Sequence, residues 1–487
     1  MNYLSFAFAG FVTVVLLLYY LLPQKARPYV LLCGSIFFYC CFTWEYLPYL
    51  LFVAASTFFS AIFFGRARQK KLLFIVCIAA NVLMWFILKD LEWMLFLSKT
   101  LLSLVNIHYD APEMYFLVPV GISYYMLQAI AYLCDVYKGR IAPEKNFLHY
   151  LLFLCYFPTI VQGPISRYEQ LMPQLLNPRP LRDGGRRESL LLVLVGVVKK
   201  MVIADRLAPF VNTCFDQFAE LHGMILYLGA VGYALQLYFD FSGCVDICRG
   251  VSGLFGIELT ANFNRPYLAR SIKEFWQKWH LSLSSWLKDY IYIPLGGNRL
   301  GAKRKYLNLL ITFLISGLWH GAGMQFVLWG ALHGLYQIIG QATQGIRQKA
   351  KVRLGIVPDS YSDRVIQTLV TFHLVTLGWI FFRSDNIASA FTYIGNIFIY
   401  SRFDVLFNNA LNDLGLSTIH VWVLIFNIVA IFALEHRTSS QKEGLQAFFR
   451  QHILLRWPVY WILFFDVLLF GAYGSGYSTA GFLYGGF

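Results

Sequence analysis

Charged side chains are scarce in this chain. Asp, Glu, Lys and Arg make up 14% of its 487 residues, whereas soluble domains carry about 25%. Hydrophobic residues reach 58% and aromatic residues 18%, which is more apolar surface than a water-exposed globule buries. The shortage of charge excludes a soluble class and predicts an integral membrane protein, in which Trp and Tyr favour the membrane–water interfaces.

Acidic residues are the rarer sign of charge, with 26 Asp and Glu against 40 Lys and Arg and a net charge of +14. An excess of positive charge is typical of nucleic-acid-binding proteins. Here the basic residues lie in short loops between apolar runs, as they do in cytoplasmic loops of membrane proteins. We therefore exclude a nucleic-acid partner and use the basic loops to assign orientation.

Metal motifs and a cleavable leader are also lacking. The nine cysteines lie mostly within apolar segments, and Cys244 and Cys248 form a C-x3-C pair with no second pair nearby, so we expect no metal or redox framework. The first three residues carry no basic charge, and the first apolar run has no small-residue cleavage site, so we expect that run to be retained. No internal repeat appears, which disfavours an inverted-repeat transporter.

Apolar runs long enough to cross a bilayer recur along the chain. We predict an all-α polytopic membrane protein with about eleven transmembrane or re-entrant helices. They form a single domain, 1–487, with a core motif region at 115–342 and C-terminal spans in 366–470. The candidate runs for these helices are 4–22, 29–42, 47–64, 72–88, 115–137, 190–204, 224–241, 306–319, 326–342, 366–382, 420–434 and 459–470. The run 148–160 is short for a span and favours a re-entrant segment.

Loop charges predict which side of the membrane each loop faces. The acidic loop around Asp110 and Glu113 is expected outside, and so is the N-terminus. The basic loops expected in the cytoplasm are 66–71, 179–187, 347–353 and 437–456.

Residues 271–293 are amphipathic but too polar to span. At 100° per residue their apolar side chains, three Trp among them, form one stripe about 120° wide. This pattern predicts a helix lying in the membrane interface with the Trp rings facing the bilayer or the protein. His280 falls at the edge of the stripe beside Ser284, where it can face a cavity, and Asp289 lies on the polar side.

Two further histidines lie within apolar sequence. His320 ends an apolar run and is followed by Gly-Ala-Gly; ionisable groups at membrane depth are costly, which suggests function. On one straight helix His333 would lie about 20 Å from His320, at 1.5 Å per residue. The two can share a site only if 321–323 breaks the helix. The alternative for each histidine is a hydrogen-bonded structural residue.

Asp240 and Asp246 form another polar cluster inside a predicted span. Two carboxylates there need partners, for which Arg249 and Lys199 are candidates. A buried structural hydrogen-bond network and a substrate contact both remain open.

Four strings resemble those of the membrane-bound O-acyltransferase family, and in particular its bacterial branch that acetylates exported polysaccharides. The resemblance covers most of the chain, and the two strings with Trp-His are the most specific. The strings are GISYYMLQAIAYLCDVYKG (121–139), QLYFDFSGCVDICRG (236–250), SIKEFWQKWHLSLSSWLKDYIYIPLGGNR (271–299) and GLWHGAGMQFVLWGALHG (317–334).

The resemblance implies a central funnel or tunnel with His320 as catalytic residue near its narrowest point. It implies that His280 is a second functional position and that His333 matches a third histidine of the polysaccharide branch. No metal ligand is expected. The full set of substrate- or tunnel-lining candidates is His333, Trp319, Asp240, Asp246, Ser284, Asp289 and Asn298.

The resemblance also implies a reaction. The acyl donor would be cytoplasmic acetyl-CoA, used as a substrate with no bound cofactor, and the acceptor an exported or cell-wall polysaccharide. An extracytoplasmic SGNH-type transferase or esterase is the expected partner, and the location is the bacterial cytoplasmic membrane, in contact with lipid. The alternatives are D-alanyl transfer to teichoic acid and a non-enzymatic acyl-group transporter. The Pro-Leu-Gly-Gly-Asn-Arg turn at 294–299, absent from the D-alanyl branch, favours acetyl transfer.

Overall fold

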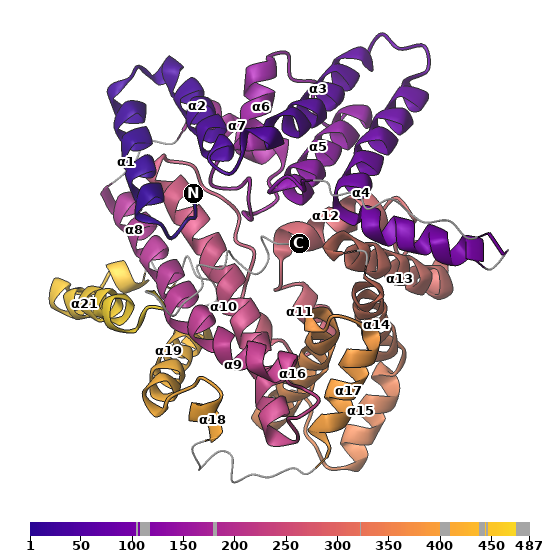
Figure 1. The fold of residues 1–487 in the computed structure, drawn as a ribbon, viewed down its shortest axis with the longest axis vertical. Coiled ribbons are helices and arrows are strands. Elements are labelled where there is room, and N and C mark those ends of the chain that lie inside the picture. The colour runs from indigo at the N-terminus through magenta and orange to yellow at the C-terminus, as the bar shows by residue number, and fades with distance from the viewer. Residues whose placement is uncertain are drawn as a thin grey trace. The chain divides into compact units, whose positions relative to one another are not determined.

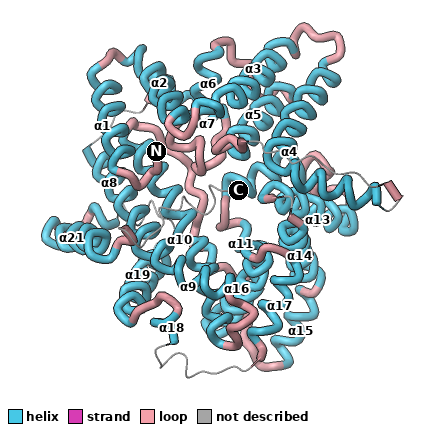
Figure 2. Tube along the Cα trace, in the orientation of Figure 1, coloured by secondary structure: helices cyan, strands magenta, loops and turns pink. Residues whose placement is uncertain are grey.

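The computed structural model describes residues 1–103, 106–107, 117–178, 183–321, 323–399, 410–437, 444 and 447–473. These residues form helices joined by turns and loops, with no β-strand among them (Figure 2). The chain forms two compact units. One comprises Met1–Leu190 with Cys248–Thr260, and the other Leu191–Ile247 with the described part of Ala261–Leu483. The all-α prediction is confirmed, and the single functional domain stays a prediction.

The first unit is built from apolar helices with clear local signals at their ends. Ser5 caps α1, because its Oγ accepts a hydrogen bond from the Phe8 N–H at 3.1 Å, and Pro28 stands in the first turn of α2, where its missing N–H costs nothing. The helices are α1 (Phe6–Leu21), α2 (Arg27–Cys40), α3 (Leu47–Phe63), α4 (Lys70–Ser103), α5 (Ile122–Tyr137), α6 (Phe147–Cys155) and α7 (Tyr168–Leu176) (Figure 1). Helix α4 kinks at Asp90.

Helix α6 covers most of the run expected to be re-entrant, a role that stays a prediction. It has nine residues, too few to cross a bilayer at 1.5 Å per residue. The chain then leaves the helix at Tyr156 and continues through Phe157 and Ile160, all fully buried. Non-helical backbone at membrane depth is tolerated where protein covers it.

The second unit carries the candidate site. Its helices are α8 (Asp183–Val197, which begins in the first unit), the π-helical turn η3 (Val198–Ala204), α9 (Asp205–Asp216), α10 (Met224–Leu254, which ends in the first unit), α11 (Ile272–Trp276), α12 (Leu281–Leu287), the π-helical turn η5 (Lys288–Tyr292), α13 (Gly301–His320), α14 (Met324–Ala342), α15 (Gln344–Arg353), α16 (Tyr361–Arg383), α17 (Ile387–Ile397), α18 (Ala410–Asp413), α19 (Thr418–Arg437) and α21 (Ile453–Phe470).

Within the described part of the chain, five helical segments are long and apolar enough to cross a membrane: Trp44–Phe63, Lys70–Leu91, Met224–Leu254, Tyr361–Arg383 and Ile453–Phe470. The polytopic prediction is confirmed, while the count of about eleven stays a prediction. Asp110, Glu113, Arg179, Arg182 and residues 438–443 and 445–446 of the 437–456 loop lie outside the described residues, as does the start of the predicted span 115–137.

Helices α13 and α14 form the tightest helix pair of the second unit. A Cβ at Gly317 would lie 2.3 Å from the Phe326 carbonyl oxygen, and one at Gly330 would lie 2.3 Å from the Phe313 carbonyl oxygen. Such small residues allow membrane helices to approach closely. Since the early residues of α14 face the late residues of α13, the two helices run antiparallel.

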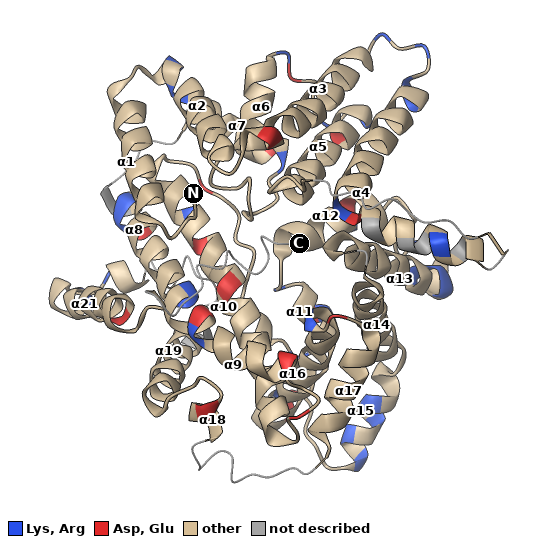
Figure 3. Cartoon of the chain, in the orientation of Figure 1, with Lys and Arg blue, Asp and Glu red and all other residues tan. Residues whose placement is uncertain are grey.

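The antiparallel pair brings basic residues to one end. Lys303, Arg304 and Lys305 lie at the start of α13, and the basic helix α15 follows the end of α14 (Figure 3). Both therefore belong to the same end of the pair, as expected for two cytoplasmic loops. The orientation itself stays a prediction.

Candidate active site

The predicted helix over 271–293 is divided in the structure. Helix α11 ends at Trp276, and His280 has left-handed backbone angles, with φ 44° and ψ 55°, before α12 begins. The cause is a neighbouring segment. The Leu281 N–H donates to the Asn262 carbonyl at 2.9 Å, and the Asn264 N–H donates to the Lys278 carbonyl at 2.9 Å. These bonds to distant backbone replace intrahelical ones, so a single continuous helix is the wrong description.

The apolar stripe of this segment faces the protein. Trp276, Trp279 and Trp286 are all buried, and their rings contact aromatic residues of other elements, as where Trp279 lies 5.1 Å from Trp379 between ring centroids. The pattern therefore identified the buried face correctly, although the helix is broken.

His280 lies at the break and is 1% exposed. Its ring meets the Phe241 ring of α10 edge-on at 4.8 Å and lies 6.1 Å from the Trp319 ring. The left-handed backbone costs a non-glycine residue of order 1 kcal/mol or more. Such strain, held by surrounding contacts, aims the imidazole at α10 and α13.

His320 is the last residue of α13 and is 2% exposed. Three aromatic rings surround its imidazole: Trp319 at 4.7 Å, Trp329 at 5.1 Å and Phe382 at 5.1 Å between centroids. Because Trp319 also contacts His280, the two imidazole centroids are at most about 11 Å apart. The environment is apolar and aromatic, which excludes bulk water from the imidazole.

His333 is fully buried on α14, where the Trp276 Nε1–H donates to its Nδ1 at 3.2 Å. The helix ends at His320 and restarts at Met324, so the straight-helix separation of about 20 Å does not apply. The His320 and His333 centroids are at most about 10 Å apart, because each lies 5.1 Å from the Trp329 centroid. The condition for a shared site, a break after His320, is therefore met.

The two buried aspartates have lysine partners. Lys199 Nζ lies 2.8 Å from Asp246 Oδ2, as one of the two expected partners predicted. Asp240 pairs with Lys200, which the sequence interpretation missed, and Lys200 Nζ also lies 2.7 Å from Asp205 Oδ1. Both lysines stand in the π-helical turn η3. The contacts favour the structural alternative, in which the pairs fix α10.

Three further candidates lie in α12, η5 and the following turn. Ser284 Oγ donates to the Trp279 carbonyl at 3.2 Å, Asp289 is half-buried in η5, and Asn298 is exposed in the turn. That turn is held by Asn308 Nδ2, which donates to the carbonyls of Leu295 and Gly297 at 3.1 and 3.0 Å. A substrate contact at these positions stays a prediction.

Comparison with known proteins gives this arrangement a family. Residues 81–382 match the family model described as MBOAT, the membrane-bound O-acyltransferase family. This range contains the three candidate histidines His280, His320 and His333. The chain belongs to the membrane-bound O-acyltransferase family. It is therefore a membrane-embedded acyltransferase, as the resemblance of its motifs predicts.

Its relatives include enzymes with different acceptors. The probable alginate O-acetylase AlgI of Pseudomonas syringae is 34% identical over 445 residues, 89% of this chain and 82% of the relative. The peptidoglycan O-acetyltransferase of Helicobacter pylori is 34% identical over 390 residues, 74% of this chain and 71% of the relative. The teichoic acid D-alanyltransferase of Bacillus subtilis is 26% identical over 301 residues, 59% of this chain and 74% of the relative.

Several residues that shape the site of this acyltransferase were missed from sequence. Trp329 contacts both His320 and His333, and Trp379 and Phe382 of α16 close the aromatic box around them. Trp329 precedes His333 by four residues, a spacing that puts both on one helix face and could have signalled it. Asn262 holds the break at His280 by accepting hydrogen bonds from the backbone N–H groups of Leu281 and Ser282. No sequence pattern predicts this role, because its partner groups are backbone atoms.

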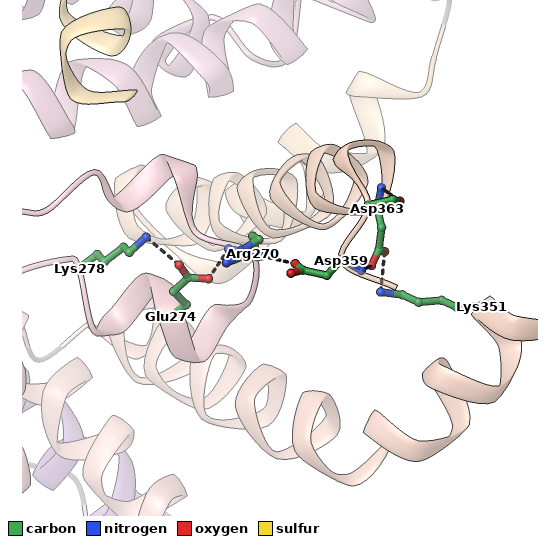
Figure 4. A network of polar contacts seen from close by, with 7 residues as sticks. Arg270, Glu274, Lys278, Lys351, Asp359 and Asp363 are labelled. Atoms are coloured by element: carbon green, nitrogen blue, oxygen red, sulfur yellow. Dashed lines mark hydrogen bonds and ion pairs between the residues drawn. The ribbon is translucent and has the colours of Figure 1, made fainter. Parts of the chain in front are cut away.

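A polar network joins the segment before α11 to Asp359 and the start of α16 (Figure 4). Arg270 pairs with Asp359 at 2.6 Å, and its backbone N–H donates to Glu274, which in turn pairs with Lys278 at 2.7 Å. In the same network Lys351 of α15 pairs with Asp363 at the start of α16 at 2.6 Å. The exposed pair Arg270–Asp359 stabilises little by itself, but the network as a whole connects the segment before α11 with α15 and the start of α16.

Proposed function

We propose that this acyltransferase is an O-acetyltransferase of the bacterial cytoplasmic membrane that acetylates an exported or cell-wall polysaccharide. Two relatives that are 34% identical over most of this chain carry names of alginate and peptidoglycan acetylation. The observation that carries the proposal is the placement of His320, a buried imidazole at the end of α13 inside a box of aromatic rings.

In this proposal His320 is the general base. The acceptor hydroxyl oxygen forms a bond to the acetyl carbon, the carbon–sulfur bond of acetyl-CoA breaks, and the hydroxyl proton passes through the imidazole to the sulfur. Positioned base catalysis contributes about 10²–10⁴-fold in rate. The aromatic surroundings exclude water, which protects the thioester from hydrolysis.

Acetyl-CoA acts as a cytoplasmic substrate, and no bound cofactor takes part. With the basic ends of α13 and α14 in the cytoplasm, His320 lies at the opposite end of a 20-residue helix, about 30 Å long at 1.5 Å per residue. An acceptor arriving from outside therefore has the shorter path. An extracytoplasmic SGNH-type partner, whose serine accepts the acetyl group before the polysaccharide, fits this geometry.

The test is acetyl transfer by the purified protein in lipid vesicles. We expect release of CoA and formation of an acetyl ester on alginate or peptidoglycan fragments, in the presence of the partner, when labelled acetyl-CoA is supplied on the cytoplasmic side. Transfer only from a D-alanyl-loaded carrier protein would assign the D-alanyl alternative. Movement of acetyl groups across the membrane without ester formation would assign the transporter.

A further inference from the structure

The hydrogen bond from Trp276 defines the protonation of His333. Trp Nε1 is a donor only, so the His333 Nδ1 that it contacts at 3.2 Å must act as acceptor. A neutral imidazole carries its one proton on the other nitrogen, so Nε2 bears the hydrogen. While this bond stands, His333 cannot accept a proton at Nε2, and that atom is a hydrogen-bond donor.

The Nε2–H group of His333 lies close against Gly378 of α16. A Cβ at Gly378 of α16 would lie 2.7 Å from Nε2, closer than to any other atom of the ring. Nε2 is buried and no described residue forms a hydrogen bond with it. A buried donor without an acceptor is costly, so such a group calls for a ligand.

A second buried donor shares the same helix face. Trp329 Nε1–H has no hydrogen-bond partner among the described residues, and its side chain is fully buried, 5.1 Å from His333 between ring centroids. Two donors without matching acceptors recognise an oxygen acceptor. Of the two oxygens that meet in acyl transfer, the acyl carbonyl oxygen is the one that becomes negatively charged and so gains most from an N–H donor.

The upper limit on the distance to His320 allows this assignment. The His320 and His333 centroids are at most about 10 Å apart. A reacting hydroxyl and carbonyl between them need two hydrogen bonds of about 2.8 Å and a near-attack contact of about 3–3.5 Å. Together these contacts span a distance of that order, with the base at one end and the donor at the other.

We infer that His333 Nε2–H, opposite Gly378, is the donor that binds the acyl carbonyl oxygen. The inference rests on the proposed acetyl transfer. As the hydroxyl oxygen bonds to the carbonyl carbon, the carbonyl oxygen becomes negative and His333 stabilises it; the charge returns when the bond to the leaving sulfur breaks. His333 keeps its proton throughout, and His320 alone moves one.

The test compares two substitutions at the same position. His333→Gln keeps an N–H donor at the reach of Nε2 but has no titrating ring, whereas His333→Leu has no donor. We expect His333→Leu to lower kcat by about 10²–10³-fold, the usual loss for one oxyanion donor. His333→Gln should recover at least a tenth of wild-type kcat with an unchanged pH profile.

Gly378→Ala tests the role of Nε2 while His333 itself is intact. Its methyl group would occupy the space in front of Nε2 and should lower kcat by at least tenfold. The matched control is Gly340→Ala on α14, where no atom lies within 4 Å of the added Cβ, and it should leave kcat within twofold.

A spectroscopic readout separates this role from a structural one. In the slowly reacting His320→Gln background, bound acetyl-CoA labelled with ¹³C at the carbonyl should show a C=O stretch at lower frequency than in water. Adding His333→Leu should return it to the higher frequency. Equal kcat and equal C=O frequency in the Gln and Leu variants of His333 would overturn the inference alone. A wild-type enzyme that releases no CoA would overturn the proposed function and the inference with it.

Discussion

The close contact of α13 and α14 at Gly317 and Gly330 predicts that one added methyl group lowers activity strongly. Gly317 stands three residues before His320 on α13, and its missing Cβ leaves room for the Phe326 carbonyl of α14. We expect Gly317→Ala to push the two helices apart next to the imidazole, because backbone cannot rotate away as a side chain can.

The structure sets the size of this displacement. The added Cβ would lie 2.3 Å from the carbonyl oxygen, whereas ordinary contact begins at 3.4 Å, so the helices must separate by about 1 Å. Overpacking of this kind costs about 1–3 kcal/mol, partly offset by the roughly 1 kcal/mol preference of Ala over Gly in a helix. A 1 Å misplacement of catalytic groups can cost about 10²-fold in rate. Activity should therefore fall far more than stability.

The assay measures acetyl ester formed per membrane-inserted molecule, alongside thermal unfolding in detergent. Gly317→Ala should lose about 10–10²-fold in kcat with a modest change in melting temperature, and Gly340→Ala, whose Cβ meets no atom, should lose little of either. Full activity in Gly317→Ala would refute the claim that this crossing positions His320.

Three further predictions concern other parts of the protein. His320→Gln, which keeps volume and hydrogen bonding but cannot take a proton, should lose about 10²–10⁴-fold in ester formation while still inserting; near-normal turnover would leave His320 structural. Lys199→Met should destabilise the protein by about 3–5 kcal/mol, because it leaves Asp246 buried and unpaired. Adding Asp246→Asn should restore most of the lost stability, as measured by thermal unfolding. A double variant as unstable as the single one contradicts the pairing. Cysteines placed at positions 68 and 349, with exposed native cysteines replaced, should resist membrane-impermeant labelling from outside the cell, and efficient labelling would reverse the predicted topology.

Local patterns predicted the helices well because each apolar run must satisfy its backbone within itself in lipid. The run 306–319 lies within α13, for example, and 326–342 lies within α14. The break at His280 was not predicted, because it depends on hydrogen bonds to backbone outside the segment. Its backbone partners are Asn262 and Asn264, and periodicity within a segment carries no information about distant carbonyls.

The candidate site shows the same division. The motifs identified His280, His320 and His333. The glycines at 321 and 323 suggested that the helix could break there, which is the condition for His320 and His333 to share a site. Their aromatic surroundings, above all Trp379 and Phe382 from α16, depend on tertiary packing that no spacing reveals. The pairing of the buried aspartates was predicted only in part. Lys199 was an expected partner, but the adjacent Lys200, which pairs with Asp240, satisfies the same sequence argument. Only the π-helical turn η3 shows which lysine faces which carboxylate.

The buried ion pairs have a consequence for how the chain enters the membrane during synthesis. Lys199 and Asp246 are 47 residues apart, so Lys199 leaves the ribosome well before its partner. Lys200 has Asp205 five residues later, but its second partner, Asp240, follows 40 residues later. An unpaired lysine at the centre of an inserting helix costs about 2.5–3.5 kcal/mol. The helical segment with η3 should therefore stay beside the insertion machinery until α10 arrives, and the two would pass into lipid together as a neutralised pair.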